Sequence, residues 1–317
     1  MVIHQVLKQR SHRLVAVGII AAFAVGGGTA YATSTTTVTA AKSNHASLAG
    51  AAGDVLVGED GGSSTVLRIH PNGTSSGHQT IVKTGKPLQS PGGLGFGPKG
   101  VLYVSDYDLT GIVRINPSTG HAVVVRKGSP FGSLSEVKFG PDGMLYASDY
   151  DFPTVWKVNP KTGHTSALAT GGKITSATYD LALGPAGAIY VAAVDGRVVK
   201  VNPKTGHQTL ISKDPKLTDL NGIGVSSKGK IYVVNRSPDE VLRVDPSKPA
   251  SSNATVITTG TNLLSEPYEI AFTLKGKLLT ANLGNNTIVQ IDPSTGHESV
   301  AFSGGMLTRP EGVTVQP

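Results

Sequence analysis

Short apolar runs recur along most of the chain, and within each run apolar residues alternate with small or polar ones. Leu94 and Phe96 form one such pair, and Val137 and Phe139 form another. Side chains two positions apart lie on the same face of a β-strand, whereas a helical face needs a spacing of three or four. Clusters of Gly, Pro, Asn and Asp bound the runs, as they bound strands that tight turns connect. The pattern therefore predicts an all-β protein.

The expected strands belong to a unit that repeats. The stretch 93–106 is closely similar to 136–149, and 180–191 repeats its first part. One turn glycine recurs in steps of 42 to 47 residues, at Gly100, Gly143, Gly187, Gly229 and Gly276. A period of this length is typical of the blades of a β-propeller, which bury their faces only against neighbouring blades.

Each unit is predicted to contain four short strands, which we name A to D in chain order. The turn from A to B reads Gly-Pro-x-Gly in three units, where Pro presets φ and Gly accepts a positive φ. Strand C follows the pattern Val-x-Arg/Lys-Ile/Val and ends at Asn-Pro or Asp-Pro. The turn from C to D reads Asn-Pro-x-Thr-Gly-His or Asp-Pro-Ser-Thr-Gly-His in four units. Both turns predict tight hairpins.

The count of strands indicates how the ring closes. Six B strands are expected, near residues 55, 102, 145, 189, 231 and 278. The first has no strand A before it, whereas 311–317 carry a strand A pattern with no strand B after it. We therefore expect a six-bladed β-propeller with four-stranded blades over 54–317, its ring closed by the C-terminal strand, which completes the first blade. Closure protects sheet edges that an open array would expose.

Two motifs carry a resemblance to known families. Gly-Pro-Asp-Gly-x-Leu-Tyr-x-Ser-Asp and Val-x-Arg-Ile-Asn-Pro resemble the six-bladed propeller superfamily of NHL repeats and SMP-30/gluconolactonase-like proteins, and they are also similar to virginiamycin B lyase-like propellers. The resemblance covers about 54–317. These motifs build blades, and the superfamily includes lactonases, lyases, esterases and interaction modules, so the resemblance predicts the architecture better than the activity.

The N-terminus has the order of a secretory signal peptide. Three basic residues precede an apolar or small-residue run over 14–25, and Ala30-Tyr31-Ala32 fits a cleavage site. An uncleaved membrane anchor is the alternative, but this run is shorter than the ~20 residues of a spanning helix. We predict a signal peptide over 1–32, cleavage after Ala32, a Thr/Ser/Ala-rich spacer over 33–53, and a secreted, extracellular protein with no membrane span after cleavage.

Composition excludes several classes of function. The chain has no Cys, which excludes disulfides, thiolate metal sites and a thiol nucleophile. Loss of the basic leader would lower the formal net charge from +7 to +4, and the remaining cations are scattered rather than clustered. Nucleic-acid binding is therefore not expected. We expect a monomer with an unknown ligand or protein partner at its top face.

Candidate binding residues cluster where each chain segment leads into strand A, which should open onto the top of the central channel. The equivalent positions offer Glu136, Asp180, Asn221, Glu269 and Glu311. Several oxygens that converge on a channel would suit Ca²⁺ or Mg²⁺, although no cofactor is certain. The alternative is that these groups are solvated residues of the channel mouth.

The SMP-30 resemblance implies part of a metal site. Glu311-Gly312 looks like that family's metal-binding Glu-Gly, and Asn221-Gly222 looks like its Asn-Gly ligand. The other two ligand positions fall at Tyr179 and Tyr268, which depart from the pattern. Their neighbours Asp180 and Glu269 could substitute for them, but adjacent residues of a regular strand are expected to point to opposite faces. The resemblance therefore implies only Glu311 and Asn221 as metal ligands.

The turns from B to C offer a second candidate surface. Asp108 and Asp151 follow Tyr107 and Tyr150 in adjacent units and could form a binding rim for a sugar or peptide, although loop tips are generally polar. The position two residues earlier reads Glu59, Asp106, Asp149, Ala193, Asn235 and Asn282 in the six units. Carboxylates or amides in five of the six predict side chains that bond the backbone of their own turn.

Other candidate chemistry is excluded by placement or by absence from the sequence. His121, His164, His207 and His297 each follow a turn from C to D in a different unit, so they cannot converge on one ion. The sequence has no Gly-x-Ser-x-Gly, His-Glu-x-x-His or phosphate-binding loop.

Two functions remain. The first is a secreted propeller that binds a ligand or partner through the top face of its channel. The alternative is a divalent-metal-dependent lactonase, hydrolase or lyase. The sequence identifies no catalytic residue and does not decide whether the protein is an enzyme.

Overall fold

The structure is a computed structural model that describes residues 50–60, 64–258 and 263–317. The predicted signal peptide, its cleavage site and most of the predicted spacer lie outside the described residues. Within the part of the chain that is described, no helix combines the length and the hydrophobicity needed to cross a membrane.

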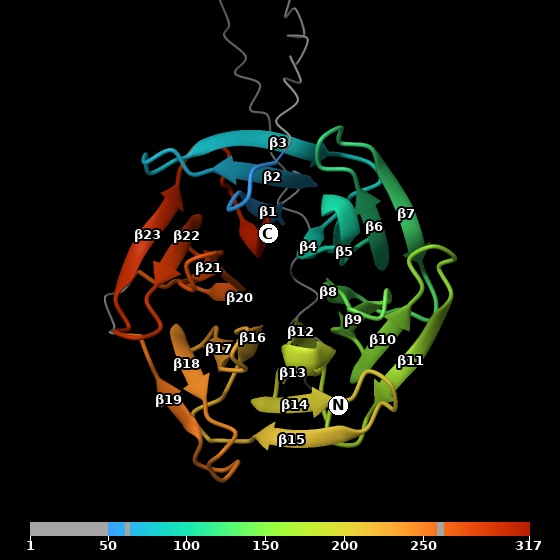
Figure 1. The fold of residues 1–317 in the computed structure, drawn as a ribbon, viewed down its shortest axis with the longest axis vertical. Helices are drawn as coiled ribbons and strands as arrows, with labels where there is room; N and C mark the ends of the chain where they lie inside the picture. The colour runs from blue at the N-terminus through green and yellow to red at the C-terminus, as the bar shows by residue number, and fades with distance from the viewer. Residues whose placement is uncertain (1–49, 61–63, 259–262) are drawn as a thin grey trace, which may run out of the picture. The chain divides into compact units, whose positions relative to one another are not determined.

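Six antiparallel sheets of four strands form a ring of blades (Figure 1). Blade 1 contains β24 (Pro310–Val315), β1 (Val55–Glu59), β2 (Thr65–His70) and β3 (His78–Thr84). Blade 2 contains β4 (Pro91–Phe96), β5 (Leu102–Asp106), β6 (Gly111–Ile115) and β7 (Ala122–Lys127). Blade 3 contains β8 (Leu134–Phe139), β9 (Leu145–Asp149), β10 (Thr154–Val158) and β11 (Thr165–Thr170).

Blade 4 contains β12 (Thr178–Leu183), β13 (Ile189–Ala193), β14 (Arg197–Val201) and β15 (Gln208–Ser212). Blade 5 contains β16 (Leu220–Val225), β17 (Ile231–Asn235), β18 (Glu240–Val244) and β19 (Ala254–Val256). Blade 6 contains β20 (Pro267–Phe272), β21 (Leu278–Asn282), β22 (Thr287–Ile291) and β23 (Glu298–Ser303). Two single 3₁₀ turns, η3 (Pro98–Gly100) and η4 (Pro185–Gly187), join strands A and B in blades 2 and 4.

The predicted closure of the ring is confirmed. β24 is the innermost strand of blade 1 and pairs antiparallel with β1, in a register that places Val55 opposite Val315 and Val57 opposite Val313. The two ends of the described chain therefore share one sheet. This pairing covers the edge of β1 that the first blade would otherwise expose.

The core lies between the blades. Each cluster of buried apolar side chains joins two neighbours; Leu56 and Val66 of blade 1, for example, pack with Leu94 and Val104 of blade 2. The alternating pattern along the strands supplies these contacts, because the inner strands have neighbours on both faces. A blade is thus stabilised mainly by the blades on either side.

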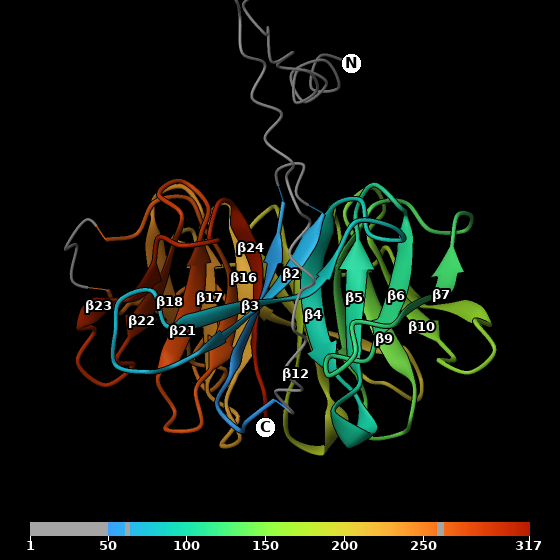
Figure 2. The same cartoon turned by 90° about the horizontal axis from the view of Figure 1, so that it is seen from above.

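The two ends of the channel are built from different loops (Figure 2). The upper face carries the turns from B to C and the connections that lead into strand A. The lower face carries the turns from A to B and from C to D. The C-to-D turns repeat one backbone pattern, in which the amide of Asn116, for example, donates to the carbonyl of His121 at 2.9 Å.

Strand A is irregular at its upper end in all six blades. Its pairing with strand B shifts register there, for example between Leu134 and Glu136 in blade 3 and between Thr178 and Asp180 in blade 4. Equivalent shifts occur in blades 1, 2, 5 and 6. Such β-bulges insert an extra residue and re-aim the side chains beside it. The channel mouth is therefore lined by bulged rather than regular strand.

Candidate functional site

The five residues predicted to meet at the channel mouth do lie together. They line one cavity of about 10 Å³: Glu136, Asp180, Asn221, Glu269 and Glu311, together with Gly93, Ser135, Tyr179 and Tyr268. A space of this size holds about one water molecule. The expectation that Asp180 and Glu269 point away from Tyr179 and Tyr268 is wrong, because the bulges bring both members of each pair to the cavity.

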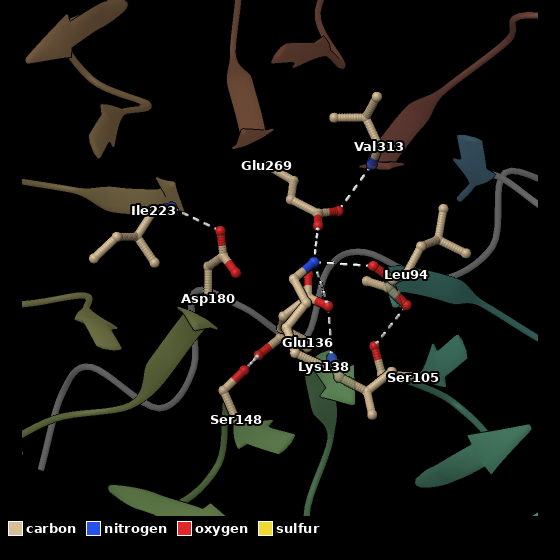
Figure 3. A network of polar contacts seen from close by, with 12 residues as sticks. Leu94, Ser105, Glu136, Lys138, Ser148, Asp180, Ile223, Glu269 and Val313 are labelled. Atoms are coloured by element: carbon tan, nitrogen blue, oxygen red, sulfur yellow. Dashed lines mark hydrogen bonds and ion pairs between the residues drawn. The ribbon is translucent and has the colours of Figure 1, made fainter. Parts of the chain in front are cut away.

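Lys138 lies at the centre of the carboxylates (Figure 3). Its ammonium nitrogen is 3.0 Å from Oε1 of Glu136 and 2.6 Å from Oε1 of Glu269, and it donates to the carbonyl of Leu94 at 2.9 Å. Ligand oxygens of Glu136, Asp180 and Glu269 lie within 4.8 Å of one another, and the three side chains are buried. We call Glu136, Lys138, Asp180 and Glu269 the Lys138 cluster.

Two carboxylates of the cluster also join neighbouring blades. Oδ2 of Asp180 in blade 4 accepts a hydrogen bond from the amide of Ile223 in blade 5 at 2.7 Å. Oε2 of Glu269 in blade 6 accepts one from the amide of Val313 in blade 1 at 2.8 Å. The second bond joins blade 6 to β24, the strand that closes the ring. The cluster therefore contributes to ring assembly as well as to the channel.

Glycine makes room for this cluster in the adjacent blade. A Cβ atom at Gly93 would lie 2.4 Å from Oε2 of Glu136, which is closer than nonbonded atoms can approach. The equivalent strand A residue is a carboxylate in blades 3, 4 and 6 and a glycine in the other three, at Gly312, Gly93 and Gly222. At Gly222 and Gly312 an added Cβ would instead meet backbone carbonyl oxygens of the neighbouring blade.

The ionisation of the cluster follows from its burial. Burial raises the pKa of Glu136 and of Asp180 well above the usual range, and repulsion from Glu269 adds to the effect. Burial alone would lower the pKa of Lys138, but attraction to Glu136 and Glu269 outweighs it and raises that pKa. One ammonium cannot neutralise three carboxylates, so the site favours the protonated form of Glu136 and Asp180.

The residues do not fit a divalent cation as they stand. The Lys138 ammonium already occupies the space among the carboxylates and supplies the positive charge that a metal would provide. Of the two implied ligands, Glu311 accepts a hydrogen bond from the Tyr179 hydroxyl at 2.6 Å. Asn221 presents a buried amide nitrogen without a hydrogen-bond partner, and a nitrogen donor is not a metal ligand. A role for Glu311 and Asn221 in metal binding stays a prediction.

Four tyrosines form a continuous chain of ring contacts above the cavity. Tyr107 contacts Tyr150, Tyr150 contacts Tyr179, and Tyr179 contacts Tyr268, with ring centroids 5.8, 5.6 and 5.4 Å apart. The guanidinium of Arg236 lies 5.9 Å from the centre of the Tyr268 ring. We call these four residues the tyrosine arc. It runs from the B-to-C turns of blades 2 and 3 to the bulges of blades 4 and 6.

The predicted rim residues Asp108 and Asp151 lie outside the cavity, beside the outer end of the arc. Both are exposed. Asp151 accepts hydrogen bonds from the amide and hydroxyl of Ser133 at 2.9 and 3.0 Å. Partial desolvation of its carboxyl group, together with repulsion from Asp106 and Asp60, raises the pKa of Asp108 even though the residue as a whole is exposed. The structure therefore places two carboxylates next to Tyr107 and Tyr150, and their role in binding stays a prediction.

The carboxylates and amides that begin the B-to-C turns bond the backbone of their own turn, as predicted, at Asp106 and Asp149, whereas Glu59, Asn235 and Asn282 bond the backbone that leads into strand A. Oδ1 of Asp106 accepts from the amide of Leu109 at 2.9 Å, and Oδ1 of Asp149 accepts from the amide of Asp151 at 3.0 Å. Asp149 also accepts from the amide of Gly132 at 2.9 Å, in the segment that leads into strand A. These side chains hold the two upper loops of a blade together.

Lys138 and the bulges are features that the sequence analysis missed. Lys138 is two residues after Glu136 and so shares its channel-facing side. The sequence does carry a signal for it, because the other five blades have small residues at this place: Gly95, Ala182, Gly224, Ala271 and Thr314. A charged residue at a position that otherwise requires small side chains indicates a specific partner.

Comparison with solved structures shows the fold. A chain in the crystal structure of a nidogen/laminin complex has a TM-score of 0.72 at 15% identity, covering 83% of this chain and 98% of its own. Virginiamycin B lyase from Staphylococcus aureus has a TM-score of 0.62 at 14% identity, covering 82% and 88%. The same values hold for a catalytically inactive variant of that lyase with quinupristin, in which a histidine is replaced by alanine.

These likenesses confirm the six-bladed propeller and the predicted similarity to virginiamycin B lyase-like propellers, and at such identities they show the fold alone. No curated protein matches the chain significantly. The model of one family, described as Tachylectin, matches residues 56–253, from β1 to the residue before β19. Because this match extends over more than half of the sequence, the chain belongs to the Tachylectin family.

Proposed function

We propose that this propeller binds a ligand at its upper face without catalysis, and that the tyrosine arc is the binding surface. The arc is the observation that carries the proposal, because four contacting rings at a channel mouth are not needed to build blades. Tyrosine offers an apolar ring and a polar hydroxyl in one side chain, which suits recognition of ligands with both characters. The Lys138 cluster closes the channel below it.

A carbohydrate is the ligand class that we propose for this surface. The family's name is that of a lectin, a carbohydrate-binding protein. Sugar rings have apolar CH faces that can lie on tyrosine rings, and hydroxyl groups that can bond carboxylates. Asp108 and Asp151 flank the first two rings of the arc, which places acceptors beside the apolar surface. A protein partner is the second candidate, favoured by the likeness to a propeller from a nidogen/laminin complex.

The lyase and hydrolase alternative has less support. The inactive lyase variant indicates that a histidine is needed for that enzyme's reaction. In the described part of this chain, every histidine lies at the lower end of a strand or in a lower turn: His70, His78, His121, His164, His207 and His297. A metal-dependent mechanism would also have to displace the Lys138 ammonium.

Glycan-array screening of the purified protein, followed by calorimetry on the best glycan, tests the proposal. Tyr150→Ala should weaken binding by about tenfold or more, because it removes ring contacts from the centre of the arc. Phe152→Ala is the matched control, since Phe152 is an aromatic residue of the same loop that is 47% exposed and outside the arc. Equal losses in both variants, or no glycan binding, would contradict the proposal.

We also propose that the protein is exported and cleaved after Ala32. The basic, apolar and small-residue order of the N-terminus supports this. Mass spectrometry of protein recovered from culture medium tests it, with a mature N-terminus at Thr33 as the expected result. A chain that retains Met1 and stays with the membrane would favour the anchor.

A further inference from the structure

A groove of about 1190 Å³ opens on the lower face between blades 2 and 3. The rings of Tyr103 and Phe139 form part of its wall and stack with centroids 5.6 Å apart and an angle of 27° between planes. Three cationic side chains line it: Lys99, Arg114 and Lys161. The groove thus combines an apolar wall with concentrated positive charge, on the opposite face from the tyrosine arc.

In blade 3 the equivalent cation is neutralised by a carboxylate of the same blade. Its strand B tyrosine, Tyr146, lies opposite the strand C cation Lys157. Oδ2 of Asp142, in the A-to-B turn, accepts hydrogen bonds from the Tyr146 hydroxyl at 2.7 Å and from Lys157 at 2.9 Å. One carboxylate therefore satisfies both the hydroxyl and the cation.

Blade 2 has the hydroxyl and the cation but not the carboxylate. Tyr103 lies opposite Arg114 in the same register. Where blade 3 reads Gly-Pro-Asp-Gly, blade 2 reads Gly-Pro-Lys-Gly, so Lys99 takes the place of Asp142. The backbone differs as well, since Lys99 has a φ of 60°. The change replaces an acceptor by a third positive charge.

No internal group supplies the missing acceptor. Across residues 50–60, 64–258 and 263–317, no carboxylate forms an ion pair with Lys99, Arg114 or Lys161, and the Tyr103 hydroxyl has no hydrogen bond. Asp142 also lines the groove, but its carboxylate is held by Tyr146 and Lys157. The groove therefore has an excess of positive charge beside the apolar wall formed by Tyr103 and Phe139.

We propose that this groove binds an organic carboxylate attached to a ring. The ligand carboxylate lies between Arg114, Lys99 and the Tyr103 hydroxyl, and so takes the part that Asp142 takes in blade 3. A guanidinium holds a carboxylate by two parallel hydrogen bonds, and charged hydrogen bonds of this kind are stronger than neutral ones. The ring lies against Tyr103 and Phe139, where aromatic side chains provide apolar surface. The site does not depend on the function proposed for the upper face.

Ligand-observed NMR on the purified protein tests this with three probes. Benzoate carries an aromatic ring and a carboxylate, galacturonate carries a sugar ring and a carboxylate, and benzamide is the neutral analogue of benzoate. We expect at least one of the two acids to bind saturably. If benzoate binds, benzamide should bind about tenfold more weakly, because only the acids can pair with the cations. Whichever acid binds more tightly identifies the kind of ring.

Variants at the groove and at a matched blade locate the site. Arg114→Gln and Lys99→Asp should each weaken binding of the acid by about tenfold or more. Lys228→Asp is the control, since blade 5 also pairs a tyrosine with an arginine, Tyr232 with Arg243, and none of these three residues lines the groove. It makes the same charge change and should leave binding unaltered. Thermal melting confirms that each variant is folded.

Four results would overturn the proposal. They are binding of neither acid, binding of benzamide as tight as that of the tighter acid, undiminished binding to Arg114→Gln, and an equal loss in Lys228→Asp. The last would show that the probes respond to net charge rather than to this groove.

Discussion

The upper and lower faces of the propeller are built from the same repeat, but they keep its regularity to different degrees. On the lower face the C-to-D turns preserve both sequence and backbone hydrogen bonds, as the Asn116 and Asn159 turns show. On the upper face each strand A bulges, and carboxylate, amide, tyrosine and glycine replace one another around the ring. Repetition is thus retained where a residue builds the blade and lost where side chains meet in the channel.

Removal of β24, the strand that closes the ring, should have the largest effect on stability. Deletion of 306–317 exposes the inner edge of β1 and removes the Val313 amide that bonds Glu269. We expect loss of cooperative unfolding, or a stability loss on the order of several kcal/mol or more, from lost burial and pairing. Circular dichroism during heating measures it, with deletion of Pro317 alone as the control. An unchanged melting temperature would show that the ring does not need this strand.

The next prediction compares a lysine of the channel with one of the lower face. Lys138→Met leaves buried carboxylates without their cation and should destabilise by about 3–5 kcal/mol. Lys157→Met breaks a partly exposed ion pair with Asp142 and should cost about 1 kcal/mol or less. Urea unfolding measures both. Adding Glu136→Gln and Glu269→Gln to Lys138→Met should restore much of the lost stability. Equal destabilisation by Lys138→Met and Lys157→Met would contradict the expected difference between the channel and the lower face.

Acid should have opposite effects on the stability that carboxyl groups of the channel and of the lower face contribute. Glu136 and Asp180 have raised pKa values, so their contribution to stability is fully present below the unfolded pKa of about 4 and declines as pH rises through the folded value. Burial acts to raise the pKa of Asp142, but hydrogen bonds from Tyr146 and Lys157 lower it. Its contribution is present above the unfolded pKa and declines as pH falls.

Melting temperatures between about pH 4 and pH 8 check this prediction. The double variant Glu136→Gln and Asp180→Asn should gain stability relative to the parent as pH rises, at up to about 1.4 kcal/mol per pH unit for each proton. Asp142→Asn should lose stability relative to the parent at neutral pH, and the difference should shrink in acid. A pH-independent difference for the double variant would mean that its carboxyl groups titrate normally.

The smallest expected effect is that of divalent cations. Because the Lys138 ammonium fills the space among the carboxylates, Ca²⁺ and Mg²⁺ should leave the melting temperature of the parent protein unchanged. Lys138→Met should acquire a cation-dependent rise, since a ligand that binds only the native state stabilises it. Differential scanning calorimetry with and without chelator distinguishes the cases. A rise in the parent that Glu311→Gln and Glu269→Gln abolish would revive the metal-dependent alternative.

The sequence predicts the blades because their signals are local and repeated: turn residues, alternation and one period. It also places Glu136, Asp180 and Glu269 at the channel mouth, because equivalent positions in a ring must converge. The Lys138 contacts depend on where side chains from blades 2, 3 and 6 meet, and no local pattern encodes such distances. The bulges were missed for a related reason, since an extra residue in a strand leaves the surrounding alternation almost intact.

The two ends of the described chain meet at the lower end of blade 1, where the Gly53 amide donates to the Gln316 carbonyl at 2.9 Å and the Gln316 side chain donates to the Gly50 carbonyl at 2.7 Å. The chain therefore enters the described part of the propeller at the same place where its last residue, Pro317, lies. A propeller immobilised through Pro317 would have its tyrosine arc on the face away from the support. The lower groove would then be the surface nearer to the support, so the two sites could be assayed separately by choice of attachment.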